Sequence, residues 1–264
     1  MDLELSGKRV LITGSYRGTG AGLARVLAAE GATVWIHGFE TEPTDAVAMS
    51  IREAGQDAHS VVGDIRTDEG ARDVAATVGE IDILINNYGV AEGGNWESST
   101  EDWIDIYQKN VLSGVRLVQA FAPGMRSRGW GRILFVSTVG YARPSSRMPH
   151  YYASKTALVN MTVSLAKELA NTGITVNCVS PGIIATAEIK EMFTRRASKA
   201  GEPTDWPSVE KKAAAGDMFM ANPAGIIGEP EDIGHLVTFL VSDKARYINA
   251  ANIRIDGGAA DSIQ

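Results

Sequence analysis

Short apolar runs alternate with longer helix-like stretches along this chain, and that alternation strongly limits the folds open to it. The strand-like runs are residues 9–13 (RVLIT), 33–37, 58–62, 81–86, 131–137, 173–179 and 252–255. Helical patterns cover residues 20–31, 44–54, 68–78, 100–125 and 150–171. Strands separated by single helices form parallel βαβ units with right-handed crossovers. The sequence therefore predicts an α/β, doubly wound fold, a parallel sheet of about seven strands with helices on both faces.

Residues 187–228 interrupt this rhythm. A bare loop of that length would be unusual in a compact domain, so we expect one or two helices in it. Its apolar side chains, which either line a substrate pocket or pack in a core, are Met192, Phe193, Trp206, Met218, Phe219 and Met220. Arg195 and Arg196 either hold a substrate carboxylate or form a solvated helix face. No repeat or linker divides the chain, so residues 1–264 are expected to form one domain.

Charge and cysteine content exclude several classes of function. The formal net charge of −7 argues against nucleic-acid and anionic-membrane partners, because both require a basic face. The one cysteine, Cys178, lies in an apolar run, which predicts a buried thiol, no internal disulfide and no metal site. The start of the chain lacks a signal-peptide pattern and no apolar run reaches the ~20 residues of a membrane span. We therefore expect a cytoplasmic protein.

A glycine loop (residues 13–20, TGSYRGTG) follows the first predicted strand and opens a helix. Glycines let the backbone turn tightly and approach a pyrophosphate closely. The helix N-terminus behind them offers free N–H groups and the positive end of a dipole. A strand before and a helix after the loop are the context that a dinucleotide-binding site needs.

The spacing of this loop, G-x-x-x-G-x-G, resembles that of the short-chain dehydrogenase/reductase family, and the resemblance covers nearly the whole chain. Residues 86–89 (NNYG) match its Asn-Asn-Ala-Gly motif, except that Tyr88 replaces alanine. Pro181-Gly182 with Thr186, residues 228–233 (GEPEDI) and residues 256–258 (DGG) match further signatures. The chain resembles 3-oxoacyl-[acyl-carrier-protein] reductase-like members, which implies a single NAD(P)-binding Rossmann domain with residues 187–228 as its substrate lid.

The resemblance also implies which residues bind the cofactor. In the family an aspartate at the position of Asp64 lies against the adenine ring, and the Pro-Gly…Thr segment contacts the nicotinamide carboxamide. The positions that match are Gly14, Ser15, Arg17, Gly18, Thr19, Gly20, Gly38, Phe39, Asp64, Ile65, Asn87, Tyr88, Gly89, Tyr151, Lys155, Pro181, Gly182, Ile184 and Thr186.

Tyr151 and Lys155 are four residues apart in a helical stretch, so both side chains lie on one face. A phenol with a pKa of about 10 is a poor base near neutrality. A lysine ammonium nearby is expected to lower that pKa, which suits general acid–base catalysis. In this family such a lysine also binds the nicotinamide ribose. Tyr152 is the neighbouring alternative, but its ring would point to a different face.

The family's third catalytic residue is a serine about thirteen positions before the tyrosine. That position holds Thr138, and Ser137 precedes it. Since neighbouring strand residues point to opposite faces, only one of the two can face the site. Thr138 is favoured, and a shift of one residue in loop 140–150 would instead bring in Ser137. Asn110 matches the asparagine that holds a proton-relay water in the family, a role that can coexist with bonding to a kinked helix backbone.

Selection between NAD(H) and NADP(H) depends on residues after the second strand and in the glycine loop. The acidic position that binds the ribose 2′-hydroxyl in NAD-dependent proteins falls on Gly38. Arg17 resembles the arginine that contacts the 2′-phosphate of NADP. Phe39 stands where a second arginine is common, and Glu40 is close enough in sequence to approach a ribose. The sequence favours NADP(H), with NAD(H) as the alternative.

The function implied is hydride transfer between NADP(H), or NAD(H), and a small ketone or secondary alcohol. Tyr151 would act as general acid or base, and Thr138 or Ser137 would hold the substrate oxygen. The alternatives are a non-catalytic NADP(H)-binding sensor and an epimerase or dehydratase with internal hydride return. Tyr88, Tyr141, Trp96 and His150 are further candidates for the pocket. Helices 100–125 and 150–171 resemble those that pack subunits in the family, which implies a homodimer or homotetramer.

Overall fold

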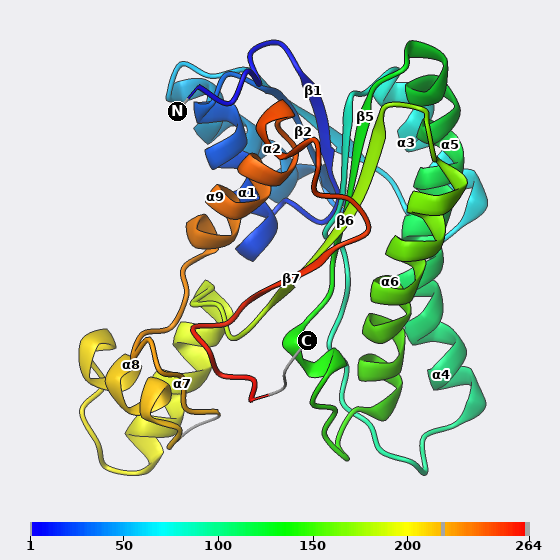
Figure 1. The fold of residues 1–264 in the computed structure, drawn as a ribbon. Helices are drawn as coiled ribbons and strands as arrows, with labels where there is room; N and C mark the ends of the chain where they lie inside the picture. The colour runs from blue at the N-terminus through cyan, green and yellow to red at the C-terminus, as the bar shows by residue number, and fades with distance from the viewer. Residues whose placement is uncertain (1, 218–219, 262–264) are drawn as a thin grey trace.

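The inner strands of the sheet are largely buried on both faces, as their apolar sequences predict. The computed structural model describes residues 2–217 and 220–261, and within them one sheet has the order β3-β2-β1-β4-β5-β6-β7 with every pair parallel (Figure 1). The strands are β1 (Arg9–Ile12), β2 (Thr33–Gly38), β3 (Ala58–Val62), β4 (Ile83–Asn86), β5 (Gly131–Val136), β6 (Ile174–Pro181) and β7 (Asn252–Ile255). The predicted fold class is confirmed.

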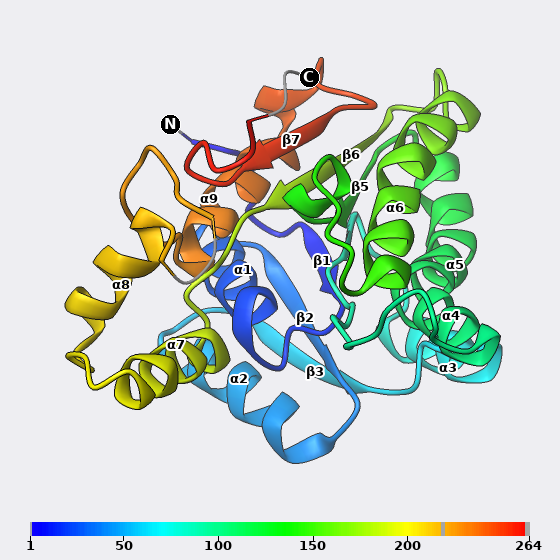
Figure 2. The same cartoon turned by 90° about the horizontal axis from the view of Figure 1, so that it is seen from below.

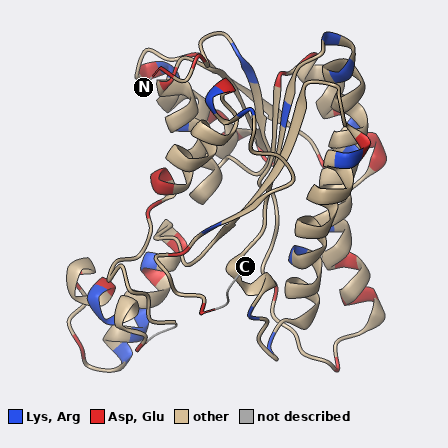
Figure 3. Ribbon diagram, viewed as in Figure 1, with Lys and Arg blue, Asp and Glu red and all other residues tan. Residues whose placement is uncertain are grey.

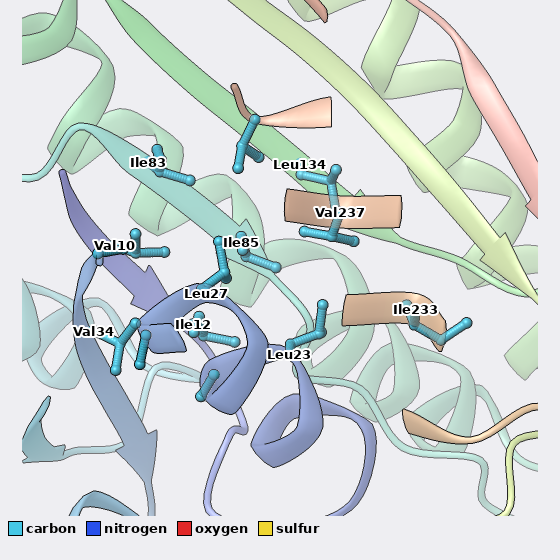
Figure 4. Close-up of a cluster of buried hydrophobic side chains, with 14 of the residues drawn as sticks. Val10, Ile12, Leu23, Leu27, Val34, Ile83, Ile85, Leu134, Ile233 and Val237 are labelled. Carbon is cyan, nitrogen blue, oxygen red and sulfur yellow. The ribbon is translucent and has the colours of Figure 1, made fainter. Parts of the chain in front are cut away.

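Three helices cover one face of the sheet: α1 (Gly18–Ala29), α2 (Thr41–Glu53) and α9 (Pro230–Leu240). Their apolar sides pack on β1, β2 and β4. Figure 4 shows Leu23 and Leu27 of α1 beside Val237 of α9, and the strand residues Ile12 and Ile85 in the same cluster. Helix α9 was not predicted, although a proline in its first turn and a capping box between Glu229 and Asp232 mark its start.

The other face carries α3 (Asp68–Val78), α5 (Ser113–Arg128) and α6 (Pro149–Glu168). Cys178 is buried in this second core, as expected. The predicted helix over 100–125 is wrong as a continuous α-helix. It consists of α4 (Thr100–Tyr107), a π-helical turn (Gln108–Leu112) and α5. Short 3₁₀ turns lie at Val139–Tyr141 and Asp243–Ala245.

Residues 187–228 contain α7 (Ala187–Lys199) and α8 (Trp206–Ala215), in agreement with the expectation of one or two helices. Both lie apart from the sheet, below α1 and α9 in Figure 1. They have a small core of their own, and Phe193 and Val209 are fully buried in it. Met192 and Trp206 pack against the same core. Of the apolar residues predicted for a pocket or a core, Met192, Phe193 and Trp206 are therefore accounted for by packing. Met218 and Phe219 lie outside the described residues.

The strand order reverses between β1 and β4, because β2 and β3 lie on one side of β1 and β4 to β7 on the other. Ligands of open α/β sheets bind at the carboxyl edge of such a switch point. Figure 3 shows charged residues of both signs on the helices and loops, while the strands are mostly uncharged. Within the described ranges no helix is long and apolar enough to span a membrane.

Candidate active site

The glycine loop lies at the carboxyl end of β1 and leads directly into α1, at the edge of the sheet seen in Figure 2. Gly14 and Gly18 have φ of +62° and +54°, a region that favours glycine. The N-cap residue of α1, Arg17, makes no side-chain cap, and the first turn contains no acidic residue. A helix N-terminus of this kind has N–H groups and a dipole suited to a phosphate.

The third glycine allows the loop to pack closely on the next strand end. A Cβ at Gly20 would lie 2.6 Å from Nδ2 of Asn87 and 2.7 Å from the carbonyl oxygen of Gly14. Asn87 donates from Nδ2 to the carbonyl oxygen of Thr13 at 2.8 Å, and the Tyr88 amide donates to Oγ1 of Thr13 at 2.9 Å. The loops after β1 and β4 are therefore fixed to each other, and the buried Gly20 leaves no room for a side chain between them.

Tyr151 and Lys155 lie one turn apart on α6, next to the end of β5. The Nζ atom of Lys155 donates to the carbonyl oxygen of Val136 at 2.9 Å, and the side chain is buried. The Tyr151 side chain forms a hydrogen bond with that of Thr138. Gly89 leaves room for the amine, because a Cβ there would lie 2.6 Å from the Lys155 Nζ atom. The structure thus brings Tyr151, Lys155 and Thr138 together.

The pKa values correct one expectation from the sequence. Burial raises the pKa of Tyr151 to about 12, and the hydrogen bond with Thr138 only partly opposes this effect. Burial also lowers the pKa of Lys155 to about 8. Lys155 was expected to lower the pKa of Tyr151, but its amine is engaged with the Val136 carbonyl and contributes no such effect here. Tyr151 is therefore a phenol that retains its proton over the usual range of pH.

The two candidate hydroxyls have different partners. Ser137 is buried, and its Oγ donates to the carbonyl oxygen of Lys155 at 2.8 Å, inside the helix packing. Thr138 is half-buried, bonds Tyr151, and accepts from the Gly140 amide at 3.3 Å. Tyr152 is only half-buried, and its ring lies edge-on to that of Tyr151 and against Gly140. Thr138 is therefore the hydroxyl beside the phenol.

Asn110 lies in the π-helical turn between α4 and α5. Its Oδ1 accepts from the Val90 amide at 2.7 Å, and its Nδ2 donates to the Val90 carbonyl at 3.0 Å and to Oγ of Ser154 at 3.0 Å. Single π-helical turns often occur at functional sites. Here the turn directs one amide toward both the loop after β4 and helix α6, and so fixes the surroundings of Tyr151.

Aromatic side chains gather at the carboxyl ends of β2 and β4. The rings of Phe39 and Tyr88 have centroids 4.8 Å apart, and the Arg66 guanidinium lies 5.1 Å from the Phe39 ring centre. Arg66 donates to both carboxylate oxygens of Asp64 and holds the pKa of Asp64 below its usual range. The side chain of Ile65 is buried in the core, so only its backbone remains for a ligand contact.

Gly38 and Ser15 limit which side chains can reach a ligand at this edge of the sheet. A Cβ at Gly38 would collide with Oγ1 of Thr44, so the strand end has no room for an acidic side chain. The backbone at Ser15 bonds that of His37, while the Ser15 hydroxyl is buried and donates to the carbonyl of Ile12 at 2.7 Å. Ser15 therefore supports the loop through the core and does not point outward.

The segment after β6 lies next to the glycine loop. Thr186 caps α7 by accepting from the Ile189 amide, and its methyl group would contact a Cβ at Gly18 at 3.4 Å. Arg17 forms an ion pair with Glu188 of α7 at 3.2 Å, with both side chains largely exposed. Pro181 ends β6, and Gly182 packs on Asp256. The glycine loop thus lies beside the first turn of α7.

Other candidate residues occupy the rim. Trp96 is 75% exposed, and its ring is tilted against that of Trp103, which in turn contacts buried His150. Tyr141 is half-buried in the 3₁₀ turn after Thr138. Arg195 and Arg196 are exposed on α7. Met220 lines a cavity of about 300 Å³ with Asn222 and Asp256.

Known proteins resemble this chain over its full length. The profile of the family described as "short chain dehydrogenase" matches residues 8–197. D-beta-hydroxybutyrate dehydrogenase of Cupriavidus necator is 32% identical over 263 residues, covering 96% of this chain and 98% of that protein. The 3-oxoacyl-[acyl-carrier-protein] reductase FabG of Haemophilus influenzae is 33% identical over 257 residues, covering 96% and 98%.

A solved structure agrees in fold. The crystal structure of L-sorbose reductase from Gluconobacter frateurii, complexed with NADPH and L-sorbose, superposes with a TM-score of 0.92 at 30% identity and covers all of both chains. The chain belongs to the short-chain dehydrogenase/reductase family of NAD(P)-dependent oxidoreductases.

Proposed function

We propose that this protein transfers a hydride between NADP(H) and a small ketone or secondary alcohol, with Tyr151 exchanging the proton. The observation that carries the proposal is the hydrogen bond between the half-buried phenol of Tyr151 and Thr138, one helical turn from Lys155. The phenol and the amine lie at the same edge of the sheet as the uncapped N-terminus of α1. An acid–base pair beside an anion-binding loop suits this reaction.

The residues at this edge fit a nicotinamide dinucleotide. The pyrophosphate would lie on the backbone of Gly18 and Thr19, and Gly20 would let the loop pack on Asn87 and Gly14 beneath it. Asp64, Phe39 and Tyr88 would border the adenosine end. Thr186 and the Pro181–Gly182 backbone would border the nicotinamide end. When bound, the cofactor supplies the hydride donor or acceptor.

The protein's own groups hold the substrate oxygen and move the proton. Thr138 and Tyr151 both present hydroxyls, so a carbonyl oxygen between them would gain two fixed donors as negative charge develops. Tyr151 has a pKa of about 12 and stays protonated, which equips it as the acid for carbonyl reduction. Alcohol oxidation needs the phenolate and is therefore expected to accelerate as the pH rises.

Lys155 and Asn110 would support this pair. Lys155 has a pKa of about 8 and is mostly a cation at neutral pH, where it can donate to a ribose hydroxyl. It would stabilise the phenolate only when its amine turns from the Val136 carbonyl toward Tyr151. Asn110 keeps the backbone of Val90 and the hydroxyl of Ser154 in place. Since Ser154 in turn donates to the Tyr151 carbonyl at 2.7 Å, Asn110 reaches the catalytic tyrosine through two bonds.

NADP(H) is proposed as the preferred cofactor. Gly38 offers no carboxylate to a ribose 2′-hydroxyl, and Thr44 leaves no space for one. Arg17 is the cation of the glycine loop, and its exposed ion pair with Glu188 is weak enough to exchange for a phosphate. Bidentate recognition of phosphate is a property of arginine.

A homodimer or homotetramer is the assembly that we propose. Ile104 and Tyr107 on α4 and Val163 on α6 are exposed apolar residues on the helices that resemble the family's packing helices. Light scattering of the purified protein would measure the assembled mass.

The reaction class is tested with the purified protein, NADPH or NADH, and a panel of ketoses, 3-oxo acids and simple ketones. We expect NADPH to be consumed in equal amount with the alcohol formed from at least one compound. Binding of NADPH without turnover, unchanged in Tyr151→Phe, would instead identify a sensor. Product formation without net change in the cofactor would identify an epimerase or dehydratase.

A further inference from the structure

His37 is a histidine with no exposed surface at the end of β2, a strand that is otherwise mostly apolar. Buried polar groups are almost always hydrogen-bonded, and both ring nitrogens of His37 are. Nδ1 accepts from the Gly14 amide at 3.1 Å, and Nε2 lies 3.0 Å from the carbonyl oxygen of Gly63. The ring therefore joins the glycine loop to the loop after β3.

These two contacts determine the tautomer. An amide N–H can donate only to an unprotonated Nδ1, and a carbonyl can accept only from a protonated Nε2. His37 is thus neutral with its proton on Nε2. Burial lowers its pKa to about 4, although the neighbouring carboxylate of Asp64, itself bonded to Arg66, acts in the opposite direction. The ring keeps this form at neutral pH.

The backbone of His37 strengthens the same connection. The Ser15 amide donates to the His37 carbonyl at 2.9 Å, and the His37 amide donates to the Ser15 hydroxyl at 3.0 Å. Gly14 thus lies between His37 on one side and Tyr88, which a Cβ at Gly14 would approach to 3.1 Å, on the other. The imidazole is the only side chain in these contacts that fixes the Gly14 amide itself.

We propose that His37 is a positioning residue for the dinucleotide: its neutral imidazole fixes the orientation of Gly14 and with it the phosphate-binding N-terminus of α1. The inference rests on the proposed function and adds a residue that does not touch the cofactor. Binding groups must be held to within about 0.5 Å by supporting bonds to be effective. Loss of the Nδ1 acceptor should therefore weaken cofactor binding without changing the chemistry.

Two substitutions test the two hydrogen bonds of the His37 ring separately. In His37→Asn the side-chain oxygen lies near the position of Nδ1 and can still accept from Gly14. In His37→Gln the amide reaches the position of Nε2 and can donate to Gly63, but the Gly14 amide loses its acceptor. His59→Gln is the matched control, because His59 is exposed on the neighbouring strand β3 and stacks on Trp35.

The dissociation constant for NADPH is measured by fluorescence, beside the unfolding temperature and kcat at saturating NADPH. We expect His37→Gln to weaken NADPH binding about tenfold, and His37→Asn and His59→Gln to remain within threefold of the unsubstituted protein. The kcat of each variant should stay within twofold. Equal weakening in His37→Asn and His37→Gln, or unchanged binding in His37→Gln, overturns the role of His37.

The ring nitrogens of the unsubstituted protein give a test that does not depend on a variant's folding. Nitrogen NMR at pH 6 to 7 should show His37 protonated on Nε2 alone, and a ring protonated on both nitrogens or on Nδ1 overturns the proposal. If the unsubstituted protein binds neither NADPH nor NADH, the proposed function fails. If it binds and His37→Gln binds equally well, only the present inference fails.

Discussion

The Nζ atom of Lys155 lies 2.9 Å from the carbonyl oxygen of Val136, which anchors the amine to the end of β5, two residues before Thr138. The amine is buried, and its pKa falls from 10.5 to about 8 because burial disfavours the cation. Lys155, the residue best placed to stabilise a phenolate, is therefore a buried cation that lowers the stability of the folded protein.

Replacement of this lysine should separate activity from stability. Because the pKa is lower in the folded chain, the cost is fully present below pH 8 and disappears as the pH rises from 8 to 10.5. A lowering of the Lys155 pKa by this amount corresponds to a destabilisation of roughly 3 kcal/mol. Replacing the lysine would recover this free energy, less the contribution of the lost bond to Val136. We expect Lys155→Met to lose at least 100-fold in kcat and to unfold at the same or a higher temperature at pH 7.

Thermal unfolding at pH 7 and pH 10 checks this prediction. The difference in unfolding temperature between Lys155→Met and the unsubstituted protein should shrink at the higher pH. Lys167→Met, an exposed lysine on the same helix, is the matched control and should change neither quantity. A variant that keeps its activity and unfolds several degrees lower at both pH values would contradict the assignment.

The two neighbouring hydroxyls should differ in their effects. Thr138→Val removes the group bonded to Tyr151 and is expected to lower kcat by 100-fold or more, whereas Thr138→Ser should stay within tenfold. Ser137→Ala removes only a buried bond to the Lys155 carbonyl and should cost about 1 kcal/mol of stability with little loss of rate. Steady-state kinetics with denaturant unfolding distinguish the two. A rate loss in Ser137→Ala equal to that in Thr138→Val would mean that Ser137 holds the substrate.

The sequence predicted most of the scaffold and the position of Tyr151 and Lys155 on one helix. The bounds of β3 and β7 agree with the predicted runs, since the stretch of strand-forming residues is a local property of the sequence. The four-residue spacing of Tyr151 and Lys155 placed both on one side of α6 for the same reason. The resemblance to the family supplied the order of the motifs.

What the sequence did not predict depends on contacts between distant residues. The π-helical turn is accompanied by bonds from Asn110 to Val90 and Ser154, which no local pattern records. The pKa of Tyr151 follows from burial that only the packed structure sets. Phe193 fits a pocket or a core equally well by sequence, and the small core of α7 and α8 decided between them. His37 was overlooked, although a histidine in an apolar strand is itself a signal.

Replacing Gly38 alone with an acidic residue should not convert the protein to NADH. A carboxylate here would bind a ribose 2′-hydroxyl, but Oγ1 of Thr44 occupies the space of the Cβ. Gly38→Asp alone is expected to weaken binding of both NADPH and NADH. Gly38→Asp combined with Thr44→Ala should shift the ratio of kcat/KM toward NADH by at least tenfold, with Thr44→Ala alone as the control. Full conversion by Gly38→Asp alone would show that Thr44 does not limit the position.

Glu188 should compete with the cofactor for Arg17. Since the ion pair at 3.2 Å is exposed, its removal costs little stability. Glu188→Gln is expected to tighten NADPH binding two- to threefold and leave NADH unchanged, while Arg17→Ala weakens NADPH about tenfold. Glu191→Gln on the same helix is the control. Equal effects on NADPH and NADH in titrations would rule out a contact between Arg17 and the 2′-phosphate.

The most direct test of hydride transfer with Tyr151 as the proton donor is the single-turnover rate of carbonyl reduction in Tyr151→Phe, measured with the dissociation constant for NADPH. We expect the rate to fall at least 1,000-fold with the dissociation constant within threefold of the unsubstituted protein. A Phe variant that reduces the carbonyl at the original rate, or an unsubstituted protein that binds no nicotinamide dinucleotide, would contradict the account.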